Sequence, residues 1–301
     1  MEIKNSELLY IYDAKFTNPN GDPDEENRPR MDYETDRNLV SDVRLKRFLR
    51  DYFQILDKDI FVTKLDGKGV TSSDRVGDLT DIKEILEKWI DVRLFGATMT
   101  IKGVKDEKGK TKKGDSIIFT GPVQFNWGIS LNKVDVIEAS ITSHFTSDEA
   151  NKQGAIGKDY RVKYSFIAFS GIVSGKRAEK TLLKNDDILL MDKGLKEAIP
   201  LLATRSKIGQ YPRLYFRVEY KDQFTYLGDL RDYIHLENNS NLSEIKDCVL
   251  VLDELIQLFE LNKDKIEKIY FFHDSALKLK SKENLVSVKE VLEGFQVEEI
   301  G

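Results

Sequence analysis

Four acids near the start of the chain have the residue types and spacing for metal or acid–base chemistry. They lie in NPNGDPDEENRPRMD at positions 18–32, and they are Asp22, Asp24, Glu25 and Glu26. Pro, Gly, Asn and Asp disfavour helices and inner strands, so this segment is predicted to be a long loop. Its carboxylates could hold Mg²⁺ or act as a base toward an RNA hydroxyl. A solvated acidic turn is the alternative that we favour.

Two other segments carry an excess of positive charge. Residues 28–50 hold seven Arg or Lys against four acids, and residues 203–217 hold four bases and no acid. Both side chains bind phosphate groups, Arg as a fork and Lys as a point charge, and such contacts position a nucleic-acid backbone without reading its sequence. The formal net charge is nevertheless −5, because residues 237–301 carry fourteen acids against eight lysines. Any basic surface is therefore predicted to be local.

The sequence offers no recognisable cofactor motif. Its three histidines (His144, His235 and His273) lack metal-binding spacing, and QGAIGKD at 153–159 lacks the spacing of a phosphate-binding loop. The one cysteine, Cys248, excludes a disulfide framework and a Cys-based zinc site, which favours a reducing compartment such as the cytoplasm. No apolar run is long enough for a signal peptide or a membrane span. We therefore expect no cofactor, no bound metal and no membrane association.

The elements that would position the charged residues follow from hydrophobic periodicity. Residues 7–16 are predicted to form a strand, and residues 39–56 an amphipathic helix. The apolar face of that helix is predicted to hold Leu45, Phe48, Leu49, Tyr52 and Leu56. The opposite face is predicted to be basic and to hold Arg44, Lys46, Arg47 and Arg50.

The rest of the chain continues an α+β pattern. Strands are predicted at 116–131, 159–173 and 212–221, and a helix at about 184–203, capped by Asn185 or Asp186. The order strand, helix, strand, strand, helix, strand is that of ferredoxin-like and RNA-recognition-motif folds. Residues 57–115 are predicted to be an insertion, with one helix at 80–96 and a lysine-rich tip at 102–113. One elaborated domain is expected.

Beyond residue 222 the periodicity predicts three further elements. An apolar helix is expected at 244–261, which includes Cys248, and a strand at 265–274. A short helix is expected to begin at Ser287, because Glu290 follows at the spacing of a capping box.

Five segments, in this order along residues 7–221, together resemble the backbone subunit of type I CRISPR Cascade. This is the seventh numbered Cas family, and the I-B and I-C forms are the most similar. The segments are NPNGDPDEENRPRMD, LVSDVRLKRFLRDY, RLFGA (93–97), GPVQFNWGISL (121–131) and RSKIGQYPRLYFRVEY (205–220).

The resemblance implies a modified RNA-recognition-motif (ferredoxin-like) palm with an inserted finger region and a β-hairpin thumb. The palm would comprise about 7–56, 116–131 and 159–221 together with 222–301. The fingers would comprise about 57–115 and the thumb about 132–160.

The resemblance also implies a non-catalytic subunit that polymerises along a guide RNA and displays its bases for pairing with target DNA. The implied partners are CRISPR RNA, target DNA through the guide, neighbouring copies of the chain and other Cascade subunits. The implied RNA-binding residues are Asn18, Asn20, Arg30, Arg44, Lys46, Arg47, Arg50, Gln124, Thr142, Ser143, Phe145, Arg205, Ser206 and Lys207.

Two other functions stay open at this point. The first is a metal-dependent endoribonuclease that uses Asp22 or Asp24, because related type III subunits cut RNA with an acid in the corresponding loop. The second is a subunit that only scaffolds other proteins and has no affinity for RNA. The motifs resemble those of type I, so we predict no cleavage and no catalytic residue.

Overall fold

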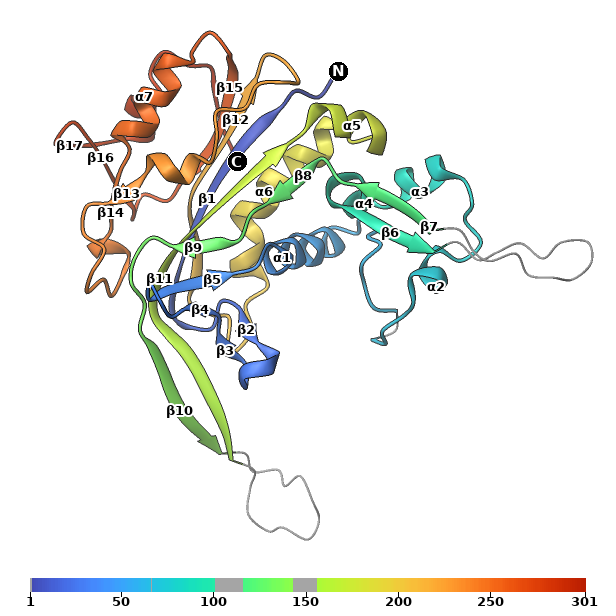
Figure 1. Cartoon of the computed structure of the whole chain (residues 1–301), viewed down its shortest axis with the longest axis horizontal. Coiled ribbons are helices and arrows are strands. Elements are labelled where there is room, and N and C mark those ends of the chain that lie inside the picture. Colours follow the sequence, from blue (N-terminus) through green and yellow to red (C-terminus); the bar gives the residue numbers. More distant parts are fainter. Residues whose placement is uncertain (1, 66, 101–115, 143–155) are drawn as a thin grey trace, which may run out of the picture.

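The computed structural model describes residues 2–65, 67–100, 116–142 and 156–301 (Figure 1). It is a mixed α and β structure built on a ten-stranded sheet, whose main path runs β18-β15-β12-β1-β11-β9-β5-β4, with β8 and β10 also paired to β11. The strands are β1 (Ser6–Thr17), β4 (Met31–Asp32), β5 (Arg37–Val40), β8 (Val123–Phe125), β9 (Gly128–Ser130), β10 (Val136–Thr142), β11 (Ile156–Val173), β12 (Gln210–Tyr220), β15 (Ile266–His273) and β18 (Val297–Glu299).

Strand β1 lies in the middle of this sheet, antiparallel to both β11 and β12. Successive side chains of a strand point to opposite faces. Tyr10 and Tyr12 accordingly join the hydrophobic core on one face, whereas Leu9 and Ile11 join the core on the other. The strand predicted at residues 7–16 is confirmed, and burial on both faces explains why it is so apolar.

Two long helices cover one face of the sheet, α1 (Asp42–Ile55) and α6 (Asn185–Leu201). The shorter α5 (Gly175–Thr181), just before α6 in the chain, packs against the same core. Helix α1 begins where the Ser41 hydroxyl accepts a hydrogen bond from the backbone N–H of Arg44 at 3.3 Å. Helix α6 confirms the prediction at about 184–203, but its N-cap is Lys184 rather than Asn185 or Asp186. The Asp187 carboxylate accepts the Lys184 backbone N–H at 3.1 Å and so fixes the start of the helix one residue earlier.

The opposite face packs against residues 222–301, which add a four-stranded sheet and helix α7 (Asp253–Leu261). The predicted apolar helix at 244–261 is wrong in its first half. Residues 249–251 form a strand there, in which the Leu250 side chain joins this second core, and buried Cys248 directly precedes it. The strand predicted at 265–274 is confirmed by β15. The small sheet comprises β13 (His235–Leu236), β14 (Val249–Val251), β16 (Lys278–Ser281) and β17 (Asn284–Val286).

Short elements complete this part of the chain. The predicted capping box of Ser287 and Glu290 is present and starts helix α8 (Val288–Val291). Two 3₁₀ turns connect the strands, η2 (Leu230–Tyr233) and η3 (Ile245–Asp247). Among the described residues, no helix is long and apolar enough to cross a bilayer.

Residues 57–100 and 116–120 form an outlying region beside the helices (Figure 1). It has its own small core around Trp89. The helix predicted at 80–96 is two helices, because Trp89 adopts an extended backbone between them (φ −110°, ψ 108°). The lysine-rich tip at 102–113 lies outside the described residues. The elements here are α2 (Ser72–Val76), α3 (Ile82–Lys88), α4 (Ile90–Phe95), β6 (Gly96–Thr100) and β7 (Ser116–Thr120).

Two features of the sheet matter for the site. The strand predicted at 116–131 is divided into β7, β8 and β9, whereas the one predicted at 159–173 is the 18-residue β11. The start of β11 pairs with β10 in a long hairpin that projects from the sheet (Figure 1). The predicted loop at 18–32 contains only short elements, β2 (Gly21–Asp22), η1 (Pro23–Glu25), β3 (Arg28–Pro29) and β4.

Candidate nucleic-acid interface

The predicted loop and the second basic segment meet directly at the end of β1. The Asn18 backbone N–H and the Thr17 hydroxyl both donate to the Ser206 carbonyl, at 2.9 and 2.6 Å. The Lys207 ammonium donates to the Asn18 carbonyl and, at 3.2 Å, to the Pro19 carbonyl. Segments that lie nearly 190 residues apart in the chain therefore form one surface, which also includes the start of α1.

Arg44 and Lys207 are basic residues at this junction that lack a carboxylate partner among the described residues. The Arg44 guanidinium lies 3.9 Å from the centre of the Phe48 ring, and its buried Nε has no hydrogen-bond partner in the described ranges. Burial lowers the pKa of Arg44. Burial, reinforced by the charge of Arg44, lowers the pKa of Lys207 to about 7. Within the described part of the chain neither side chain forms an ion pair, so the junction is suited to an anion such as a phosphate group.

Three buried oxygens around these cations also lack partners among the described residues. They are the Tyr12 hydroxyl, Asn18 Oδ1 and Gln210 Oε1. Buried polar groups are normally hydrogen-bonded, and a group of exceptions beside two unpaired cations is typical of a site that binds a ligand. Tyr12 and Gln210 were not predicted from the sequence. Tyr12 is part of an apolar strand, and only the three-dimensional structure brings it next to Arg44.

Asn20 and Arg30 brace the loop from within. Asn20 Oδ1 accepts hydrogen bonds from both the backbone N–H and the hydroxyl of Ser41, each at 2.9 Å. Because Ser41 caps α1, Asn20 fixes the entry into the helix. Arg30 Nη1 lies 2.7 Å from Asp22 Oδ2. Both polar groups are thus already engaged within the chain.

The acids of the loop have partners or face solvent. Asp22 pairs with Arg30, and its other oxygen accepts the Asp24 backbone N–H at 3.1 Å. Glu26 accepts a hydrogen bond from the Tyr160 hydroxyl at 2.8 Å, which lowers the pKa of the Glu26 carboxyl. Asp24 and Glu25 are exposed. Among the described residues no group of three or more His, Cys, Asp or Glu is placed to hold a metal ion.

The predicted basic back of α1 is partly wrong. Lys46 and Arg50 are only 9% and 8% exposed, and Leu56, which was placed on the apolar face, is 41% exposed. Arg50 Nε lies 2.8 Å from Asp91 Oδ2, so it joins α1 to the outlying region. Arg47 pairs with Asp51 at the edge of the helix and donates to the Val62 carbonyl at 2.9 Å. Periodicity locates a helix face but does not show which neighbour covers it.

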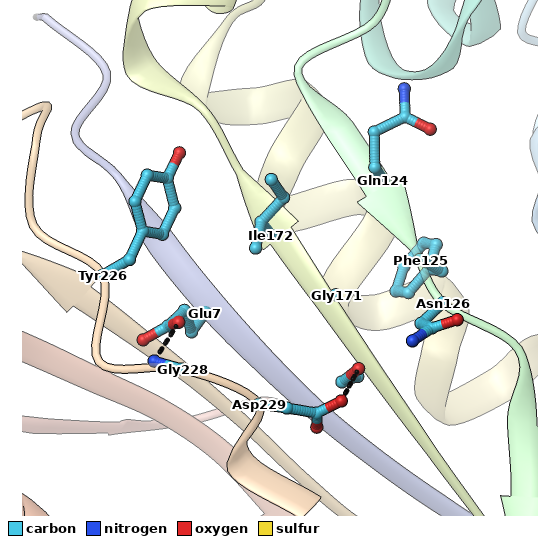
Figure 2. A pocket seen from close by; sticks show the side chains of 10 residues that line it. Glu7, Gln124, Phe125, Asn126, Gly171, Ile172, Tyr226, Gly228 and Asp229 are labelled. Atoms are coloured by element: carbon cyan, nitrogen blue, oxygen red, sulfur yellow. Dashed lines mark hydrogen bonds between the residues drawn. The ribbon is translucent and has the colours of Figure 1, made fainter.

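Lys46 and Gln124 form a second polar contact, away from Arg44. Lys46 Nζ lies 3.1 Å from both Asp42 Oδ2 and Gln124 Oε1. Gln124 also lines an open groove of about 530 Å³ between β8, β11 and the segment after β12. Figure 2 shows that the two acids of this groove are engaged, Glu7 with the Gly228 backbone N–H and Asp229 with the Ser170 hydroxyl. The groove thus lacks the unpaired charge found at the first site.

Comparison with known proteins shows which family the chain belongs to. The family model of CRISPR-associated protein Cas7 matches residues 4–253. A CRISPR-associated protein Cas7 of Haloferax volcanii is 37% identical over 302 aligned positions, which cover 92% of this chain and 89% of the relative. The chain belongs to the Cas7 family.

Two solved structures share the fold. A chain of a CRISPR RNA-guided surveillance complex, described as pre-nicking, superposes with a TM-score of 0.52 over 98% of this chain and 96% of its own length. A chain of a second CRISPR RNA-guided surveillance complex has a TM-score of 0.51 and covers 93% and 95%. Both are 12% identical to this chain, so they show similarity of fold.

Of the remaining predicted residues of this Cas7-family chain, Arg205 lies beside the long hairpin. The Arg205 side chain is 66% exposed and lies 3.5 Å from Asp159 Oδ2. Ser206 contributes its carbonyl to the junction described above. Ser143 and Phe145 lie outside the described residues, and only the backbone of Thr142, at the end of β10, is described.

The family motif RLFGA contains a residue whose role the sequence did not reveal. Arg93 is 7% exposed, and its Nε and Nη2 each lie 2.8 Å from an oxygen of Asp187 on α6. Its Nη1 donates to the Leu86 and Glu87 carbonyls. A buried, bidentate ion pair of this kind fixes geometry, so Arg93 holds the outlying region against α6. The partner is 94 residues away, and no local spacing could have indicated it.

Proposed function

We propose that this chain is a non-catalytic, guide-RNA-binding backbone subunit of a type I Cascade effector, similar to the I-B and I-C forms. It polymerises along CRISPR RNA, contacts neighbouring copies and other Cascade subunits, and displays the guide for pairing with target DNA. The observation that supports this most is the junction of Arg44 and Lys207, where two half-buried basic side chains form no ion pair among the described residues and can donate to an anionic ligand. Membership of the Cas7 family makes RNA the expected ligand.

The parts of the fold take the following roles in this proposal. The chain is one elaborated domain. Its modified RNA-recognition-motif palm corresponds to about 7–56, 116–131 and 159–221 with 222–301, its fingers to about 57–115, and its thumb to about 132–160. The thumb folds over the RNA held by the neighbouring copy, with Thr142, Ser143 and Phe145 at its contacting tip.

The predicted RNA-binding residues divide into two groups within this proposal. Arg44, Lys207 and Arg205 offer charge to the RNA backbone, and Asn18 and Ser206 line the same surface. The others act mainly by positioning these, because their polar groups pair with other side chains, whereas Lys207 donates to backbone carbonyls and Arg205 is 66% exposed. They are Asn20, Arg30, Lys46, Arg47, Arg50 and Gln124.

The engaged state of Asp22 supports a role for the loop acids in shape rather than in catalysis. The Arg30 guanidinium partly neutralises the Asp22 carboxylate and, with the Asp24 backbone N–H, fixes its orientation, which makes it a poorer general base or metal ligand; Asp24 is exposed to solvent. RNA would therefore stay intact in the complex, and pairing with the guide would supply sequence recognition.

The test is light scattering behind a sizing column, with purified protein and a guide-length RNA, with and without Mg²⁺. We expect a complex of several protomers and RNA that is recovered intact on a gel. Arg44→Ala combined with Lys207→Ala should abolish the complex at moderate salt, whereas Lys193→Ala, an exposed lysine of α6, should not. A monomer with RNA shortened in Mg²⁺, and protection by Asp22→Ala or Asp24→Ala, would instead establish the endoribonuclease.

A further inference from the structure

Phe16, near the end of β1, has an unusual combination of exposure and backbone conformation. Phe16 is 54% exposed, and only Lys15 beside it shares this exposure, whereas the other residues of β1 are buried. Its φ is +50°, which is rare for a bulky residue and unfavourable unless the surroundings impose it. Within the described residues no aromatic ring or cation is packed against the Phe16 ring. A strained residue that presents an unpaired ring to solvent is a candidate for function.

Contacts on both sides of Phe16 hold this conformation. The Lys15 backbone N–H donates to the Gly209 carbonyl at 2.8 Å, and the Thr17 hydroxyl donates to the Ser206 carbonyl at 2.6 Å. Arg161 Nη1 donates to the carbonyl of Phe16 itself at 2.9 Å. Gly209 must approach closely, because a Cβ there would lie 2.5 Å from the Lys15 carbonyl oxygen. The ring is thus presented by a rigid frame.

The surroundings of the ring combine apolar surface with positive charge. Ile208 is 60% exposed. In the sequence it lies between Ser206 and Gly209, whose carbonyls accept hydrogen bonds from the end of β1. Arg205 is exposed, and both Arg205 and Arg161 approach Asp159. Lys15, next to Phe16 in the chain, pairs with Glu244 at 3.2 Å. Lys207 and its carbonyl partner at Asn18 lie next to Phe16 in the fold. Aromatic rings between cations are typical of surfaces that bind single-stranded nucleic acid.

We propose that the Phe16 ring is a stacking platform for one nucleobase of bound RNA, whose phosphate lies at Arg44 and Lys207. The inference rests on the proposed function and adds a contact with a base to the contacts with the backbone. Every base has an apolar face, so stacking on a ring tolerates any sequence. A subunit that must hold guides of different sequence needs a contact of this type.

The test compares RNA with a strand that has no bases. The variant Phe16→Gly removes the ring and tolerates a positive φ, so its melting temperature should be unchanged or higher. We expect its affinity for a mixed-sequence RNA of twelve nucleotides to fall about tenfold, as measured by fluorescence anisotropy at fixed salt. Its affinity for an abasic ribose-phosphate strand of the same length should not change.

Two further variants serve as controls. Phe16→Tyr retains a ring and should bind both strands like the wild type. Phe224→Gly removes a ring that is 78% exposed and lies elsewhere, near Lys176, and it should affect neither strand.

Three results would overturn the inference in distinguishable ways. Equal loss on both strands would mean that Phe16 acts through the backbone of the loop. Unchanged affinity combined with a smaller RNA-dependent assembly would mean that the ring contacts a neighbouring copy. If the wild-type chain binds neither strand, the proposed function fails and the stacking role fails with it.

Discussion

Two regions of this molecule hold arginine or lysine away from full solvent exposure and differ in which groups face the charge. At the seam with the outlying region, Arg50 and Arg93 each meet a buried carboxylate, Asp91 and Asp187. At the end of β1, Lys207 donates to carbonyls, Arg44 lies over an aromatic ring, and neither forms an ion pair within the part of the chain that the structure describes. The first arrangement is complete within the chain, and the second is incomplete. A basic residue in a family motif can thus fix the fold or bind a ligand, and its partners decide which.

Breaking the seam should have the largest effect. Asp187→Ala leaves the Arg93 guanidinium buried without its carboxylate, and we expect a loss of about 3–5 kcal/mol in the free energy of unfolding. Urea denaturation measures it. Asp51→Ala is the matched control, because Arg47 and Asp51 are roughly one-third exposed and such pairs contribute at most about 1 kcal/mol. Similar losses in the two variants would remove the distinction between the regions.

The pH dependence of RNA binding should show that the charge of Lys207, at the end of β1, is used by the ligand. The pKa of Lys207 is about 7 in the free chain, and a bound phosphate favours its charged form. Below pH 7 the amine is already protonated, so RNA affinity should be level. Above pH 7 binding must take up a proton, and affinity should fall by up to about tenfold per pH unit. Anisotropy between pH 6 and 9 at constant ionic strength measures this.

The control for this titration is Lys207→Arg, which stays charged and should give a nearly flat profile. The stability of the RNA-free protein should move in the opposite direction. Because the unfolded chain binds more protons between pH 7 and the ordinary lysine pKa of 10.5, unfolding free energy should rise with pH across that window. An RNA affinity that falls identically in the wild type and in Lys207→Arg would assign the pH dependence to another group.

The smallest effect is expected at Asn20. This residue lies on the proposed binding surface, but its side chain is hydrogen-bonded to Ser41 within the chain. Asn20→Ala removes the acceptor that orients Ser41, and we expect a loss of about 1 kcal/mol in unfolding free energy. RNA affinity should change less than about threefold. Thermal unfolding and anisotropy on the same preparation separate the two roles. A tenfold loss of affinity at unchanged stability would instead make Asn20 a direct contact.

The sequence predicted elements whose character depends on local pattern. The strand at β1, the helices α1 and α6, and the capping box at Ser287 were all predictable, because periodicity and cap chemistry are local. Residues 249–251 were mistaken for helix, because an apolar run does not show whether it will complete a sheet. The division of the helix at Trp89 was missed, because the small core that requires it is assembled from distant residues.

The candidate site was predictable as a set of charges but not as an arrangement. The second basic segment contacts the loop at 18–32, and the charge of Arg44 from the first basic segment acts on Lys207, a meeting that the excess of Arg and Lys did not predict. The burial of Lys46 and Arg50 was not foreseeable. Arg50 pairs with Asp91, which is 41 residues away in the chain, and Lys46 contacts Gln124, which is 78 residues away. The unpartnered Tyr12 hydroxyl likewise has no signature in sequence. Long-range pairing, rather than residue type, separates bracing residues from ligand-binding ones.

Strand β11 has a mechanical consequence. Its 18 residues run without interruption from the projecting hairpin to the middle of the sheet, where the strand is bonded along almost the whole length of β1. A pull on the hairpin along the strand therefore loads many hydrogen bonds in shear at once, instead of opening them one by one. The angle of the hairpin is set by the twist of the sheet. If copies of this chain assemble through their hairpins, the distance between successive copies will be set by the central sheet that holds each hairpin in place.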